Sequence, residues 1–146
     1  MATFPIVLAH GIARFDILAE VLENKLKLPE GSGTEKFQYF KRIKEDLEAK
    51  GFSVSHPNVD FAGPVDLRAE QLRDRVNAVI QSSGSPKVHI IAHSMGGLDA
   101  RHMIVDKGMA ERVATLTTIG TPHHGSPVAD RIEQPGEHSY DRYWIK

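Results

Sequence analysis

The sequence contains no cysteine, and this single absence excludes disulfide bonds, thiolate metal sites and thiol catalysis. No apolar run approaches the roughly 18 residues that a membrane-spanning helix needs. The first residues also lack the basic segment and long apolar stretch that are typical of a secretory signal peptide. We therefore expect a soluble chain, either cytoplasmic or secreted after removal of a leader.

An excess of charge of either sign is also missing. The 18 lysines and arginines nearly balance the 19 acidic residues, which leaves a formal net charge of −1. Such a chain has no long-range field that would attract nucleic acid or an anionic membrane. With 40% hydrophobic and 25% charged residues, the composition is typical of a soluble globular protein. We predict a single domain over residues 1–146.

Short apolar runs alternate with amphipathic segments along the chain. The predicted strands are residues 4–9, 52–55, 88–92 and 113–119. The predicted helices are residues 35–50, 66–81 and 96–107, with a further candidate at 17–26, and Asp66 is expected to cap the second of these. This alternation predicts an α/β fold, a mostly parallel sheet with helices on both faces and right-handed crossovers.

The segment Ala-His-Ser-Met-Gly-Gly, residues 92–97, falls where the third predicted strand ends and the next helix begins. This is the setting of the G-x-S-x-G nucleophile elbow, in which a tight turn projects the serine hydroxyl above the sheet. Ala92 and Gly96 are small enough for the strand and helix backbones to approach closely, although the usual motif has glycine where Ala92 stands. Ser94 is therefore predicted to be a catalytic nucleophile.

Two backbone amides are predicted to form an oxyanion hole beside this serine. The unpaired N–H groups and the dipole at the start of a helix favour negative charge, which makes the Met95 N–H the first donor. A second donor is expected from the loop after the first strand, which reads His10-Gly11-Ile12. We assign this second role to the Ile12 N–H.

Three motifs, residues 5–12, 92–97 and 119–126, resemble the true bacterial lipases of the Pseudomonas and Burkholderia type. The resemblance covers residues 4–130. It implies an α/β-hydrolase fold, hydrolysis of carboxylic esters with a preference for lipid esters, and no organic cofactor. It also implies that Ser94 is the nucleophile, that Met95 and Ile12 are the oxyanion donors, and that residues 121–126 form a loop near the site.

A serine hydroxyl needs a histidine base, which is itself oriented by a carboxylate. In this fold the acid and the histidine follow the serine on later loops. The resemblance implies that both, together with a calcium site that many members carry, lie beyond Lys146, so we expect an N-terminal part of a hydrolase that stops after the fourth strand. A triad improvised inside this chain, from His124 or His138 with Asp130 or Asp141, is the less favoured alternative.

Other polar residues are given non-catalytic roles. His10 and His93 adjoin buried strand ends and are expected to make structural hydrogen bonds. The adjacent side chains of His123 and His124 diverge and lack a further ligand at helical spacing, so we predict no metal site and a loop that shapes the site. Three arginines are predicted to form a solvated face: Arg68, Arg73 and Arg75.

The sequence thus predicts an enzyme, a serine ester hydrolase of the lipase or carboxylesterase type that works through an acyl-enzyme and acts on lipid or short-chain esters. An alternative is a catalytically incomplete fragment, or a binding module that retains the nucleophile turn. An acyltransferase or thioesterase with the same turn is a third hypothesis. If the chain ends at residue 146, the strand at 113–119 would be an open edge, and such edges favour pairing with a second copy of the chain.

Overall fold

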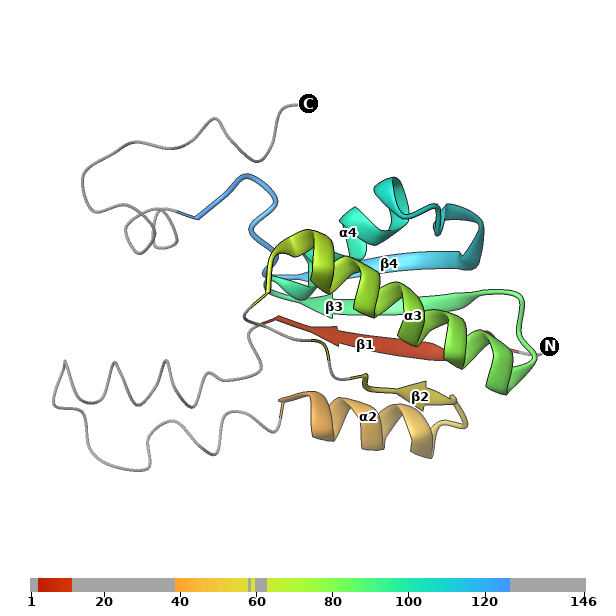
Figure 1. Ribbon diagram of the computed structural model, residues 1–146. Helices are drawn as coiled ribbons and strands as arrows, with labels where there is room; N and C mark the ends of the chain where they lie inside the picture. The colour runs from red at the N-terminus through yellow and green to blue at the C-terminus, as the bar shows by residue number, and fades with distance from the viewer. Residues whose placement is uncertain (1–2, 12–38, 58, 60–62, 127–146) are drawn as a thin grey trace, which may run out of the picture.

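The computed structural model describes residues 3–11, 39–57, 59 and 63–126 (Figure 1). Within this part, four strands form one sheet in the order β2-β1-β3-β4, and every neighbouring pair is parallel. The strands are β1 (Ile6–His10), β2 (Val54–Ser55), β3 (Val88–His93) and β4 (Val113–Ile119). The parallel sheet predicted from the alternating pattern is confirmed.

Helices cover both faces of this sheet. Helices α3 (Val65–Ser83) and α4 (Gly96–Asp106) pack together on one face, and α2 (Tyr39–Ala49) lies against the other (Figure 1). A short 3-10 turn, η2 (Ala110–Arg112), connects α4 to β4. No helix in the described part is long and apolar enough to cross a membrane.

Strand β1 is apolar from Ile6 to Ala9 because both of its faces are buried. Val7 and Ala9 belong to the cluster under α3 and α4, whereas Ile6 and Leu8 belong to the cluster under α2. Because both faces of a central parallel strand are buried, its sequence has no polar alternation. The buried strand predicted at residues 4–9 is confirmed, with bounds shifted to Ile6–His10.

Several helix ends follow the predicted chemistry. Gly51 has φ 86°, and the Phe52 N–H donates to the Leu47 carbonyl at 3.1 Å, so the predicted glycine cap of α2 is confirmed. Helix α3 ends in the same way at Gly84, with φ 65°. The predicted helix at residues 17–26 lies outside the described residues.

The predicted cap of α3 is wrong. Pro64 occupies the cap position and makes no side-chain cap hydrogen bond, while Asp66 lies inside the first turn. Its carboxylate instead contacts His102 of the neighbouring helix α4 and Lys107, which directly follows that helix. Asp66 therefore connects α3 to α4 rather than closing the end of its own helix.

Strand β4 pairs only with β3 among the residues that the structure describes. Dimerisation through its outer edge stays a prediction.

The core under α3 and α4 should be sensitive to the loss of volume. Ile90 of β3 is completely buried there, so Ile90→Ala should lower the free energy of unfolding by about 2–5 kcal/mol through lost burial and a residual cavity. Urea unfolding followed by circular dichroism measures the change. As a control, Val105→Ala on α4, where the side chain is 69% exposed, should change stability by no more than about 0.5 kcal/mol. Equal effects of the two substitutions would contradict the described packing.

Candidate active site

Ser94 occupies the turn between β3 and α4 in a left-handed backbone conformation. Its φ is 54°, and it is the only non-glycine residue with positive φ in the described part of the chain. For an L-residue this conformation costs about 1–2 kcal/mol. Hydrogen bonds on both sides hold it: the Ser94 N–H donates to the Ile119 carbonyl at 2.9 Å, and the Gly97 N–H donates to the Ser94 carbonyl at 3.1 Å. The turn is therefore as sharp as the motif predicts.

Gly96 brings the start of α4 into direct contact with the backbone of β1. A Cβ at this position would lie 2.5 Å from the Ala9 carbonyl oxygen and 2.8 Å from the Ala9 carbonyl carbon. Real Cβ atoms do not approach backbone so closely, so only glycine fits. Two residues before the serine, Ala92 is completely buried in the core cluster, and its methyl group is accommodated there.

Two further glycines join loops to the same turn. A Cβ on Gly11 would lie 2.7 Å from the Met95 nitrogen, so the segment that follows β1 is packed against the nucleophile turn. A Cβ on Gly97 would overlap the side chain of Thr121, which follows β4. The ends of β1, β3 and β4 thus converge on Ser94, as expected for the carboxyl edge of a parallel sheet.

Met95 occupies the N-cap position of α4, with φ −58° and ψ −27°. Its carbonyl accepts hydrogen bonds from the Leu98 and Asp99 N–H groups. No hydrogen bond from the Met95 N–H to another described residue is present. The Met95 N–H lies beside Ser94 at the start of α4, whereas Ile12, the predicted second donor, lies outside the described residues.

His10 and its neighbour His56 form a pair at the end of β1. The His10 Nδ1–H donates to the Gly11 carbonyl at 3.0 Å, and the two rings meet edge to face with centroids 4.6 Å apart. Burial, followed by the charges of His10 and Lys44, lowers the pKa of His56.

The later histidines that the structure describes face other partners. His102 contacts Asp66 at 3.1 Å and Asp106 at 2.7 Å on the surface of α3 and α4. His123 lies 3.3 Å from Thr118 Oγ1, and His124 is exposed. The remaining members of the improvised triad lie outside the described residues: Asp130, His138 and Asp141.

Arg68 is not part of a solvated face, and that prediction is wrong for this residue. It is 8% exposed and contacts Asp99 of α4, which is 3% exposed. Burial raises the pKa of the Asp99 carboxyl, and the hydrogen bonds from Arg68 oppose that shift. The signal was present in the sequence, because Arg68 stands four and eight residues before Leu72 and Val76 on the buried stripe of α3. Arg75 is exposed, as predicted.

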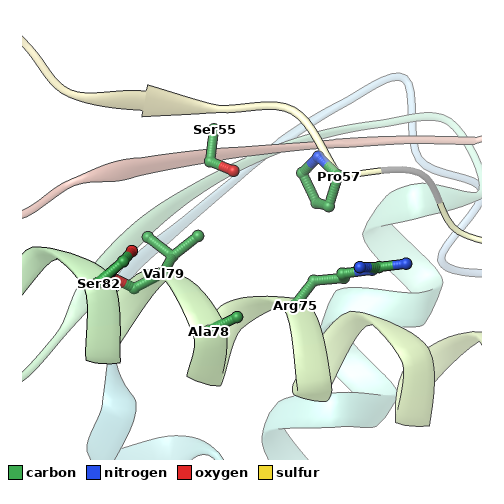
Figure 2. A pocket seen from close by; sticks show the side chains of 6 residues that line it. All are labelled: Ser55, Pro57, Arg75, Ala78, Val79 and Ser82. Carbon is green, nitrogen blue, oxygen red and sulfur yellow. The ribbon is translucent and has the colours of Figure 1, made fainter.

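A hollow of about 450 Å³ lies away from the serine, between α3 and the segment after β2. No residue of the nucleophile turn lines it, so it is not the substrate pocket that a reaction at Ser94 requires. Figure 2 shows its lining side chains: Ser55, Pro57, Arg75, Ala78, Val79 and Ser82.

A parallel sheet with helices on both faces and a serine in the strand-to-helix turn defines the α/β-hydrolase fold. A solved structure supports this class: the mature lipase BlEst2 of Bacillus licheniformis matches with a TM-score of 0.69 and 22% identity, over 94% of this chain and 48% of that one. The family model of the PGAP1-like alpha/beta domain matches residues 66–146, more than half of the chain. The chain belongs to this family.

Curated triacylglycerol lipases are similar in sequence. Those of Pseudarthrobacter phenanthrenivorans and Burkholderia plantarii are each 35% identical over 134 residues, which is 89% of this chain. The match spans 36% and 32% of their respective lengths, about a third of each. The predicted resemblance to bacterial lipases is confirmed.

The contact at Gly96 predicts a large effect from one added methyl group. Gly96→Ala should destabilise the protein by about 1–3 kcal/mol or more, because α4 must move away from β1. Urea unfolding measures the effect. Gly84→Asn is the control, since the space around Gly84 is open and asparagine tolerates its left-handed conformation; its cost should stay below about 1 kcal/mol. A Gly96→Ala protein of wild-type stability would contradict the close approach.

The contacts of Asp66 predict a measurable pKa change. The hydrogen bond from Lys107, followed by that from His102, lowers the pKa of Asp66 below its ordinary 3.8. Lys107→Met should therefore raise the pKa of Asp66 in a carboxyl NMR titration. A lowered folded-state pKa contributes stability above the unfolded-state pKa and loses it as the pH falls through the folded-state value. The wild-type advantage should consequently be constant well above pH 3.8 and shrink as the pH falls below 3.8.

Lys50 provides a matched control for this titration. It is an exposed lysine directly after α2, on the other side of the sheet from Asp66. Lys50→Met should leave the pKa of Asp66 unchanged. A shift of equal size in both variants would show that general charge, rather than the contact with Lys107, controls this carboxyl.

Proposed function

We propose that this protein is a serine ester hydrolase in which Ser94 Oγ attacks the ester carbonyl carbon. The alcohol leaves, an acyl-enzyme forms, and water then releases the acid and restores the serine. One observation carries the proposal: Ser94 is held at φ 54° between β3 and α4, at the edge where the strands end. A strained conformation of this kind is retained where the surrounding packing maintains it, and it occurs often at functional sites.

The tetrahedral intermediate would place a negative oxygen at the start of α4. The Met95 N–H and the helix dipole favour negative charge at that point. We assign the second donor to the Ile12 N–H, in the segment that follows Gly11. Gly11 packs against the Met95 nitrogen, which supports a donor from this segment. One such donor is typically worth about 10²–10³ in rate.

We propose lipid or short-chain carboxylic esters as substrates. The support comes from the relatives, which are triacylglycerol lipases from several bacteria and from Saccharomyces cerevisiae, where the identity is 31%. Their chains are two to three times as long as the matched part, since the match spans 32% to 48% of each. Acyl-chain preference depends on the pocket walls around Ser94.

The second candidate is a catalytically incomplete protein, which retains the nucleophile turn but has no base that activates Ser94. It is favoured by the partners of two later histidines, since His102 contacts Asp66 and Asp106, and His123 contacts Thr118. Catalysis requires such a base, since a serine hydroxyl is a weak nucleophile at neutral pH. In this case Ser94 would bind or present an ester without turning it over.

Covalent labelling separates the two candidates. A fluorophosphonate should modify the wild-type protein once, seen as a single adduct by intact mass, and p-nitrophenyl butyrate should be hydrolysed. Ser94→Ala should abolish both signals because the attacking oxygen is gone. Ser82→Ala, at an exposed serine near the end of α3, should label like the wild type.

A folded wild-type protein that resists labelling would reject the hydrolase and favour the incomplete form. Labelling that persists in Ser94→Ala would reject Ser94 as the nucleophile.

A further inference from the structure

The interior of the described part holds one pair of charges, which lies directly behind the nucleophile turn. Arg68 and Asp99 are the only buried polar or charged residues among those described, at 8% and 3% exposure. Arg68 Nε lies 3.0 and 3.1 Å from the two Asp99 oxygens, and Nη2 lies 2.9 Å from Oδ1. Nη1 donates to the Gly63 carbonyl. This geometry is a forked guanidinium–carboxylate contact.

Asp99 is one helical turn from the proposed oxyanion donor. It lies in the first turn of α4, and its N–H donates to the Met95 carbonyl at 3.2 Å. A carboxylate here stabilises the start of the helix in the resting protein. During attack by Ser94, however, a second negative charge develops at the same helix start, so an unneutralised Asp99 would oppose the reaction.

Stability alone is a poor explanation for this pair. Removing two charges from water is costly, and apolar residues of similar volume often replace a buried ion pair without loss of stability. The pair lies on two helices whose nearby buried residues are apolar, because Ala69, Leu72, Ala100 and Met103 belong to one buried cluster, and these surroundings would suit such a replacement. Stability therefore does not explain why this ion pair lies next to the nucleophile turn.

We propose that Arg68 is a positioning residue that neutralises Asp99 and so keeps the start of α4 receptive to the negative charge formed on attack by Ser94. This inference rests on the proposed function. An uncompensated unit charge about 10 Å from the oxygen on which negative charge forms, at an effective dielectric constant of about 20, changes the reaction rate by roughly tenfold. His102, the other titratable group that acts on Asp99, lies further along α4 and already contacts Asp66 and Asp106.

The proposal predicts opposite outcomes for the two halves of the pair. Arg68→Met leaves Asp99 buried without its partner, and at a pH high enough to ionise this carboxyl it should slow the second-order labelling of Ser94 by an uncharged fluorophosphonate about tenfold. Asp99→Asn leaves the cation of Arg68 near the helix start and should label at least as fast as the wild type. A purely structural role would instead slow both variants in step with their loss of stability, which urea unfolding records.

A double variant supplies the rescue test. Arg68→Met/Asp99→Leu removes both charges and should restore labelling to within about threefold of the wild type. If Arg68→Met alone does not fold, Asp99→Asn and the double variant still decide, because charge balance predicts fast labelling in both and a structural role predicts slow labelling in both. Labelling that is equally slow in all three, or unchanged in Arg68→Met, would overturn the inference.

The wild-type control separates this inference from the proposed function. A wild-type protein that is not labelled at all rejects the hydrolase, and the role of Arg68 in it falls as well. If the wild type is labelled but both single variants are labelled more slowly, only the role of Arg68 is rejected.

Discussion

The backbone contact between the start of α4 and the end of β1 is the constraint on which the site depends. At Gly96 the two backbones leave no space for a single Cβ atom. This approach allows the chain to reverse from β3 into α4 within one left-handed residue, Ser94. The cost of that conformation is small beside the apolar surface that β1, β3, α3 and α4 bury together. Packing in the core thus maintains strain in the turn.

A second consequence of this packing is electrostatic. The helix that begins beside Ser94 aims its unpaired amides and dipole at the point where negative charge would form. Its neighbour α3 contributes Arg68 to the buried contact with Asp99 and Asp66 to the surface contacts with His102 and Lys107. The two helices are therefore held together by a buried ion pair and by surface ion pairs as well as by apolar contacts. The orientation of the helix start follows from both.

Much of the fold could be predicted because its signals are local. A strand buried on both faces is mostly apolar, so β1 and β3 were predictable to within one or two residues, and β4 at its exact bounds. The serine turn was predictable because the strand, the serine and the small residues are adjacent in sequence. Asp66 and Arg68 were interpreted wrongly, because their partners lie more than 30 residues away on α4. The local pattern places Arg68 on the buried stripe of α3, but it does not identify the distant partner of either residue.

The sequence by itself determined the alternating elements, the serine between a strand and a helix, and the small residues that make a tight turn there. Only the tertiary structure decided that Gly96 touches Ala9, that Gly11 packs against the turn, and that Arg68 is buried against Asp99. The physical reason is the sequence separation between the residues that interact. Periodicity and turn chemistry act between residues close in the chain, whereas close approach and ion pairing depend on which distant segments the folded sheet brings together.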